Sequence, residues 1–263
     1  MTDSRKPRFP LSLNGLTDLS PAVAAVLAKH ELDNDWIGDL RLNGLKALLP
    51  EAARALAAHR GNVRLDSLER LDSLPLAQKL AGQKGELRLG LRELAPAIAT
   101  ELAKHRGFDS NNSKSNPRGR VDGAASVLRF DNIESLSPET AEALAAHEGV
   151  LVLNGLVSLD PAVAASLAKR TGSSKTKRTG TLVLNGLPEI STEAAAALAA
   201  FTGEIVLKAI TELSPETAAA LAKHKGRLHL TGLVRPGPET LVALKSHPQV
   251  LLPTWFAEVL PVR

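Results

Sequence analysis

A unit of about 23 residues repeats along almost the whole chain, and it constrains the fold more than any other feature of the sequence. In its most regular form the unit reads L-x-L-x-G-L-x-x-L-S-P-E-x-A-x-x-L-A-x-H-x-G. Copies begin at Leu11, Leu40, Val63, Leu87, Leu128, Leu151, Leu182, Ile205 and Leu228, and a half-copy begins at Leu251. Because repeat arrays grow by stacking, the 263 residues predict one elongated array rather than two globular cores.

Each unit predicts one short strand followed by one short helix. The opening L-x-L has the period of two that is typical of a strand with one buried face. A capping residue followed by proline then predicts a helix start, as at Ser20-Pro21, Ser137-Pro138, Asp160-Pro161 and Ser214-Pro215. About ten helical residues follow, with apolar positions three and four apart. A glycine is expected to close the helix, at Gly61, Gly85, Gly107, Gly149, Gly172, Gly203 and Gly226.

The stacked units predict an α/β fold, a curved αβ solenoid. Neighbouring strands in a sheet lie ~4.8 Å apart, whereas even alanine-rich helices need ~8 Å or more. This mismatch bends the stack, so we expect parallel strands on the concave face and short helices on the convex face.

The pattern resembles the leucine-rich-repeat superfamily, in an atypical short form seen in bacterial proteins, over about residues 11–251. The L-x-L strand and the strand–helix alternation carry the resemblance. The usual repeat has asparagine three residues after the second strand leucine. Here that position is apolar, and asparagine lies two places earlier, at Asn14, Asn43, Asn154 and Asn185. The resemblance implies a protein-binding scaffold, which is an analogy from the fold.

The ends and the insertions divide the array. Residues 1–10 form a flexible N-terminal segment that lacks the apolar core of a signal peptide. Residues 11–250 hold nine repeats, interrupted by insertions at 31–39, 108–127 and 173–181 that should share one rim, and residues 251–263 form a C-terminal cap. The apolar runs are too short to span a bilayer. Because cysteine is absent, a reducing, cytoplasmic location is expected.

The positive charge of the chain belongs to two of these insertions. Residues 104–120 carry a net +4 and residues 169–178 a net +5, which leaves −5 on the rest of a chain whose total is +4. The basic rim loops hold Lys114, Arg118, Arg120, Lys175, Lys177 and Arg178. They suggest polyanion or nucleic-acid binding as an alternative function. Nucleic acid is disfavoured, because the body is acidic and aromatic side chains that could stack on bases make up only 3% of the chain.

No pattern in the chain predicts catalysis, a cofactor or a metal site. Six of the seven histidines occupy one repeat position near the helix end, where a cationic or hydrogen-bonding side chain is favoured. They are His30, His59, His105, His147, His224 and His247, and Arg170 and Phe201 take that position in other repeats. A zinc site needs three or four convergent ligands, which this spacing does not supply. We therefore expect a non-enzymatic protein.

The residue between the two strand leucines is the best candidate for partner binding. Along the array it reads Arg41, Arg64, Arg88, Arg129, Val152, Val183, Val206 and His229, after Ser12 in the first repeat. The favoured hypothesis is a monomeric scaffold that grips a protein partner of acidic character on this concave wall. Two alternatives remain open. The arginines can pair with Asp66, Glu86 and Asp131, and the chain can be a purely structural module of a larger protein.

Overall fold

Strands and helices alternate throughout the part of the chain that the computed structural model describes, residues 10–29, 39–107, 126–170, 180–234 and 236–254. The helices are α1 (Pro21–Ala28), α2 (Pro50–Ala57), α3 (Leu74–Ala81), α4 (Pro96–Ala103), α5 (Pro138–Ala145), α6 (Pro161–Ala168), α7 (Thr192–Leu198), α8 (Pro215–Leu221) and α9 (Pro238–Lys245). The strands are β1 (Leu11–Ser12), β2 (Leu40–Arg41), β3 (Val63–Arg64), β4 (Leu87–Leu89), β5 (Val127–Phe130), β6 (Val150–Val152), β7 (Thr181–Val183), β8 (Glu204–Val206), β9 (Leu228–His229) and β10 (Val250–Leu251).

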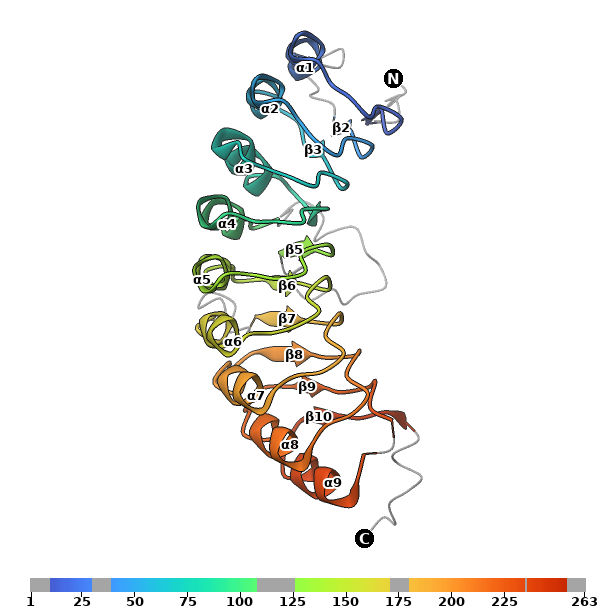
Figure 1. Cartoon of the computed structure of the whole chain (residues 1–263). Helices are drawn as coiled ribbons and strands as arrows, with labels where there is room; N and C mark the ends of the chain where they lie inside the picture. The colour runs from blue at the N-terminus through green and yellow to red at the C-terminus, as the bar shows by residue number, and fades with distance from the viewer. Residues whose placement is uncertain (1–9, 30–38, 108–125, 171–179, 235, 255–263) are drawn as a thin grey trace, which may run out of the picture.

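This alternation confirms the predicted strand–helix unit. Every strand begins within one residue of its predicted start, and β10 is the expected half-copy. Each paired strand runs parallel to a neighbour in chain order. Figure 1 shows a bent stack, with the helices on the outer side of the bend and the strands on the inner side. Two strands begin inside predicted insertions, β5 at Val127 and β7 at Thr181, and the bulk of all three insertions lies outside the described residues.

The helices start where capping residues and prolines predict them. The side-chain oxygens of Ser20, Ser137 and Ser214 each accept the backbone N–H three residues later. Asp160 accepts the N–H of Ala162 at 2.7 Å. Proline follows each of these caps, where the missing N–H leaves no bond unmade. Within the described ranges, no helix is long and apolar enough to cross a membrane.

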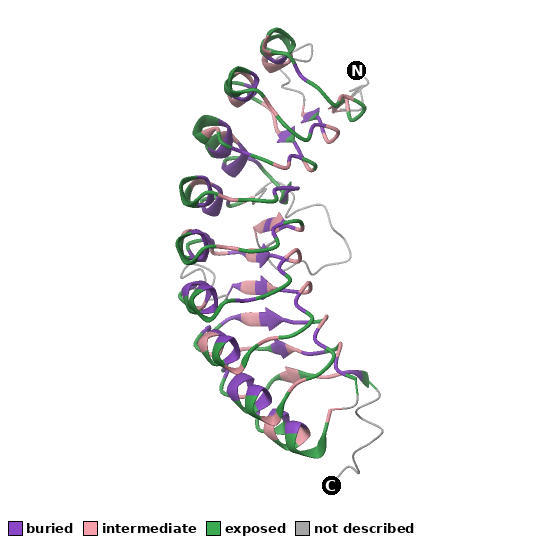
Figure 2. Cartoon of the chain, viewed as in Figure 1, coloured by how far each residue is buried: buried purple, intermediate pink, exposed green. Residues whose placement is uncertain are grey.

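The core runs the length of the stack between the strands and the helices. In the sixth repeat Leu151, Leu153 and Leu156 are fully buried, and the alanine of the neighbouring helix, Ala141, is buried against them. Figure 2 shows buried residues on the inward side of each helix. Small alanines on these sides let successive helices pack together in chain order.

The repeat glycines serve a different purpose from the predicted one. Helix α5 ends in a cap at Ala146 with right-handed backbone, three residues before Gly149. Of the described glycines, Gly85 and Gly107 have positive φ. A Cβ at Gly149 would lie 1.9 Å from the carbonyl oxygen of Ser126 in the preceding repeat. Gly107, Gly149, Gly203 and Gly226 therefore permit close approach of neighbouring backbones instead of closing helices, whereas a Cβ at Gly85 would meet nothing within 4 Å.

Asparagines in the turn after each strand link successive repeats. Each side-chain oxygen accepts a hydrogen bond from the backbone N–H at the equivalent position of the next repeat, at 3.1 to 3.3 Å. These bonds join Asn14 to Asn43, Asn43 to Asp66, Asn154 to Asn185 and Asn185 to Lys208. Asparagine thus bridges repeats from a position two residues before the one that the leucine-rich-repeat pattern would use.

The strands form two sheets, although the uniform repeat predicted a single array of strands. Strands β1–β3 form one sheet and β4–β10 form the other. At the junction the backbone N–H of Val63 donates to the side-chain Oε1 of Gln83 at 2.9 Å. In the preceding repeat, Leu40 donates the equivalent N–H to the backbone carbonyl of Asn62. A side chain therefore takes the place of the first ladder bond between β3 and β4, while α3 and α4 still pack together.

Candidate binding surface

The middle residues of the strands line up across both sheets, and we call them the inner row. The register pairs Ser12 with Arg41 and Arg41 with Arg64 in the first sheet. In the second sheet, neighbours are paired in the order Arg88, Arg129, Val152, Val183, Val206, His229 and Leu251. The predicted row of four arginines is therefore not continuous, because the sheet break separates Arg64 from Arg88.

The first sheet presents two arginines to solvent. Arg41 and Arg64 are exposed and adjacent in register. Neither forms an ion pair with another residue of the described ranges. The predicted partner Asp66 forms no ion pair with either arginine in the described residues. Two guanidinium groups are thus left able to bind carboxylates.

The next two arginines are already partnered. Arg88 lies 3.2 Å from Asp131, and Arg129 lies 2.6 Å from Glu86 and 3.6 Å from Asp131. The hydrogen bond that Arg129 Nε donates to Glu86 raises the pKa of Arg129 above its ordinary value. The side chain of Arg88 is 55% exposed and that of Arg129 only 31%. The predicted pairing with Glu86 and Asp131 is confirmed, and it neutralises this part of the inner row.

The apolar part of the inner row is more covered than an open patch would be. Val152 is 3% exposed and Val206 is 9% exposed, whereas Val183 is half-buried. Side chains on adjacent parallel strands lie about 5 Å apart, so branched neighbours cover one another. His229 is half-buried and hydrogen bonds with Glu204. The sequence identified the row correctly but could not show how little of each valine remains accessible.

A second repeated feature lies in the loops that lead from each helix to the next strand. We call it the loop column, and within the described ranges it consists of His59, Gln83, His105, His147, Arg170, Phe201, His224 and His247, all of them buried. The rings of His105 and His147 stack with centroids 6.5 Å apart, and those of His224 and His247 stack at 5.8 Å. Nothing in the sequence except the shared repeat position pointed to this stacking.

The column histidines bond to the preceding helix. The Nδ1 atoms of His59, His105 and His147 lie 3.2, 3.0 and 3.3 Å from the carbonyl oxygens of Ala28, Ala81 and Ala103. Each of these alanines is the last residue of its helix, where carbonyl oxygens lack partners within the helix. For these three histidines the predicted hydrogen-bonding role is met between repeats, because each caps the helix before its own. His224 departs from it, since neither of its ring nitrogens has a hydrogen-bond partner among the described residues.

Burial keeps part of the column uncharged. Burial, followed by the nearby positive charge of Arg170, lowers the pKa of His147 to about 4. Burial also lowers the pKa of His224 and His247. Arg170 donates from Nη2 to the carbonyl oxygen of Gly149 at 2.8 Å, and burial lowers its pKa to about 10. Within the described part of the chain, no three histidine or carboxylate side chains are grouped so as to hold a metal ion.

The inner row and the loop column make up only part of the surface for which the sequence predicted a function. The basic rim-loop residues Lys114, Arg118, Arg120, Lys175, Lys177 and Arg178 lie outside the described residues. No family model matches the chain, and no curated protein matches it. The function therefore has to follow from the inner row and its surroundings.

Acidification is expected to destabilise the protein through His147. The unfolded chain takes up a proton near pH 6.5, whereas folded His147 does so only near pH 4, so the unfolded state binds more protons between these values. Stability should fall by about 2 kcal/mol between about pH 7.5 and pH 5, measured as the urea midpoint. The variant His147→Phe introduces the residue type that Phe201 already provides at this repeat position. It should show a smaller loss of stability over the same pH range. An equal loss in both proteins would contradict this assignment.

Proposed function

We propose that the protein is a non-enzymatic, leucine-rich-repeat-like solenoid that binds a protein partner along its inner row. It would act as a monomer in the cytoplasm. The observation that carries the proposal is the change in character along the row. Exposed Arg41 and Arg64, which form no ion pair among the described residues, lie at one end. The ion-paired Arg88 and Arg129 follow, and beyond them lie three valines, of which Val183 is half-buried and the other two are buried.

This order favours a partner segment with acidic residues followed by apolar ones. Carboxylates would bind Arg41 and Arg64, and apolar side chains would lie over Val183 and its neighbours. Strands lie ~4.8 Å apart and an extended chain advances ~3.3 Å per residue. An extended segment crossing from β2 to β7 therefore needs at least roughly eight residues. A segment of about twelve would also extend beyond the arginines at one end and beyond Val183 at the other.

The test uses defined peptides and fluorescence anisotropy. A labelled peptide with four acidic residues followed by a short polar spacer and four apolar residues should bind, and an all-acidic peptide should bind more weakly. The variant combining Arg41→Glu with Arg64→Glu should weaken binding about ten-fold at low salt, and less at high salt, because exposed charges are screened. Val183→Asp should weaken binding at every salt concentration.

The matched control is Lys223→Glu with Lys225→Glu, which changes the net charge equally at two exposed residues away from the inner row. It should leave peptide binding unchanged. If both pairs of substitutions weaken binding alike, the attraction is only a net-charge effect and the inner row is not the site. Strong retention on heparin at physiological salt would instead favour the rim loops as a polyanion site.

A further inference from the structure

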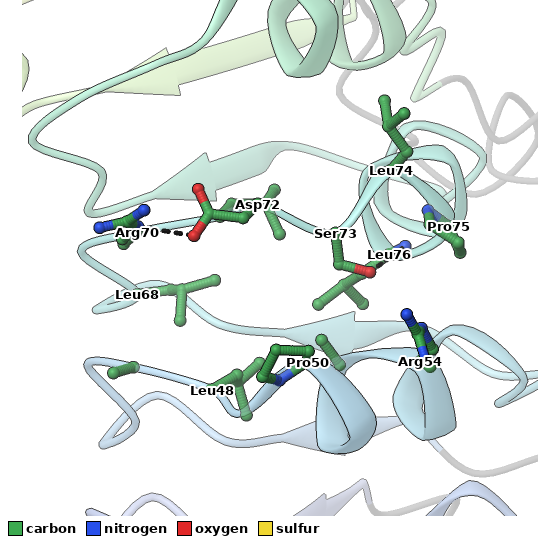
Figure 3. Close-up of a pocket in the computed structure, with 13 residues that line it drawn as sticks. Leu48, Pro50, Arg54, Leu68, Arg70, Asp72, Ser73, Leu74, Pro75 and Leu76 are labelled. Carbon is green, nitrogen blue, oxygen red and sulfur yellow. Dashed lines mark hydrogen bonds and ion pairs between the residues drawn. The ribbon is translucent and has the colours of Figure 1, made fainter.

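A cavity of about 390 Å³ opens between the segments that lead into α2 and α3, separate from the inner row. Figure 3 shows Leu48 and Pro50 on one side and Ser73, Leu74 and Leu76 on the other. The accessible part of its lining includes half-buried Leu48 and exposed Pro50 and Pro75, whereas Leu68, Leu71 and Leu76 in the same lining are buried. A cavity of this size falls within the range of small-molecule sites.

The cavity has a specific cause in the sequence. In the second repeat ten positions separate the first strand residue, Leu40, from the first helix residue, Pro50. In the third repeat eleven separate Val63 from Leu74, so this repeat carries one additional residue before its helix. Neighbouring segments of unequal length cannot pack at constant spacing, and apolar surface is left uncovered. Leu74 at the mouth remains 43% exposed.

The charged groups at the mouth favour an anion. Arg70 pairs with Asp72 through an Nε–Oδ2 contact of 2.6 Å, so these two side chains compensate each other. Arg54 also lines the cavity, is exposed, and forms no ion pair with any residue in the described ranges. Figure 3 shows Arg54 beside Pro75, at the opposite end from Arg70 and Asp72. The first turn of α3 begins at the same mouth and adds the positive end of a helix dipole.

We propose that this cavity binds a small amphipathic carboxylate, with an aliphatic or aromatic body against Leu48, Pro50 and Pro75 and its carboxylate on Arg54. An apolar body gains free energy by leaving water, and the accessible apolar surface that it covers gains in the same way. The carboxylate pairs with the one guanidinium of the cavity lining that has no partner among the described residues. The site is independent of the partner proposed for the inner row, and either can exist without the other.

Calorimetric titration with octanoate, octanol and octylammonium tests both parts of the site. Octanoate should bind most tightly and octylammonium most weakly, since the apolar chain is constant and only the head group changes. Ala47→Trp places a larger side chain at an exposed position of the cavity lining, and it should reduce octanoate affinity at least ten-fold. Arg54→Gln should reduce octanoate affinity about three- to five-fold, as expected for an exposed ion pair, and leave octanol affinity unchanged.

The control Lys223→Gln removes the same charge from an exposed position outside the cavity and should leave octanoate affinity unchanged. Thermal unfolding of each variant shows that it is folded before titration. Unchanged octanoate affinity in a folded Ala47→Trp variant would overturn the location. Equal affinity for octanoate and octanol, or equal effects of Arg54→Gln and Lys223→Gln, would overturn the carboxylate assignment.

Discussion

Replacing Leu153 by aspartate is expected to lower the free energy of unfolding by at least about 4 kcal/mol. Leu153 is fully buried next to β6, and its backbone N–H donates to the carbonyl of Val183 at 2.9 Å. A carboxylate at this position would be desolvated with no cation beside it in the apolar core. Because each repeat packs mainly on its neighbours, the loss of packing should extend to the repeats on both sides of the sixth. Urea unfolding followed by circular dichroism measures the loss.

The control for this substitution is Val157→Asp in the same repeat. Val157 is 55% exposed, so an aspartate there keeps its water and should change stability by less than about 0.5 kcal/mol. Comparable losses in the two variants would show that the acidic residue disturbs the array through net charge and not through burial in the core.

Alanine at Gly186 is expected to destabilise the protein by about 3 kcal/mol or more. A Cβ there would lie 1.8 Å from the backbone oxygen of Asn154 and 2.9 Å from that of Leu156. Both atoms belong to the backbone of the preceding repeat, so rotation of a side chain cannot relieve the overlap. The two repeats would have to separate, which would also strain the hydrogen bond from the N–H of Asn185 to Asn154 Oδ1.

Gly15 provides a matched control, since it occupies the same turn position in the first repeat. A Cβ at Gly15 meets no atom within 4 Å. Alanine there should be neutral, or should stabilise by up to about 1 kcal/mol by restricting the unfolded chain. If Gly15→Ala and Gly186→Ala had the same effect, the turn conformation would be responsible and close packing between repeats would not.

The regular features of the fold were predictable because they depend on local patterns. The L-x-L spacing sets each strand, and a cap followed by proline sets the helix start, as Ser137 and Pro138 do for α5. These signals act over a few residues and recur in every copy. Even the irregular β10 was visible, because Leu251 begins a recognisable half-copy.

What the sequence did not predict depends on contacts between repeats. Gln83 occupies a position where other repeats carry histidine, yet its amide bonds to Val63 and ends a sheet. The sequence also could not predict that Val152 would be almost fully covered, or that Gly149 would be needed for close packing. Each of these outcomes requires knowing the distance between one repeat and the next.

The candidate sites, like the fold, were predictable where they depend on local patterns and not where they depend on contacts between repeats. The inner row followed from strand periodicity, and the pairing of Arg129 with Glu86 was one of its stated alternatives. The cavity near Arg54 was not predicted, although the additional residue before Leu74 was visible in the sequence. A difference of one residue between neighbouring copies indicates a packing defect, but only coordinates show whether the defect is filled.

The break between β3 and β4 also affects how the array responds to tension. Elsewhere in the second sheet, separating two repeats along the stack requires several ladder hydrogen bonds to break together. At the break, two bonds to side chains, Val63 N–H to Gln83 and Lys84 N–H to Asn62, replace the ladder, and one backbone bond from Arg92 to Glu69 joins the turns that follow. A force applied through the two ends of the array should therefore extend it first at this junction. The two sheets would then behave as two rigid segments joined by a more extensible junction. Arg41 and Arg64 lie on one segment, and the valines of the inner row lie on the other.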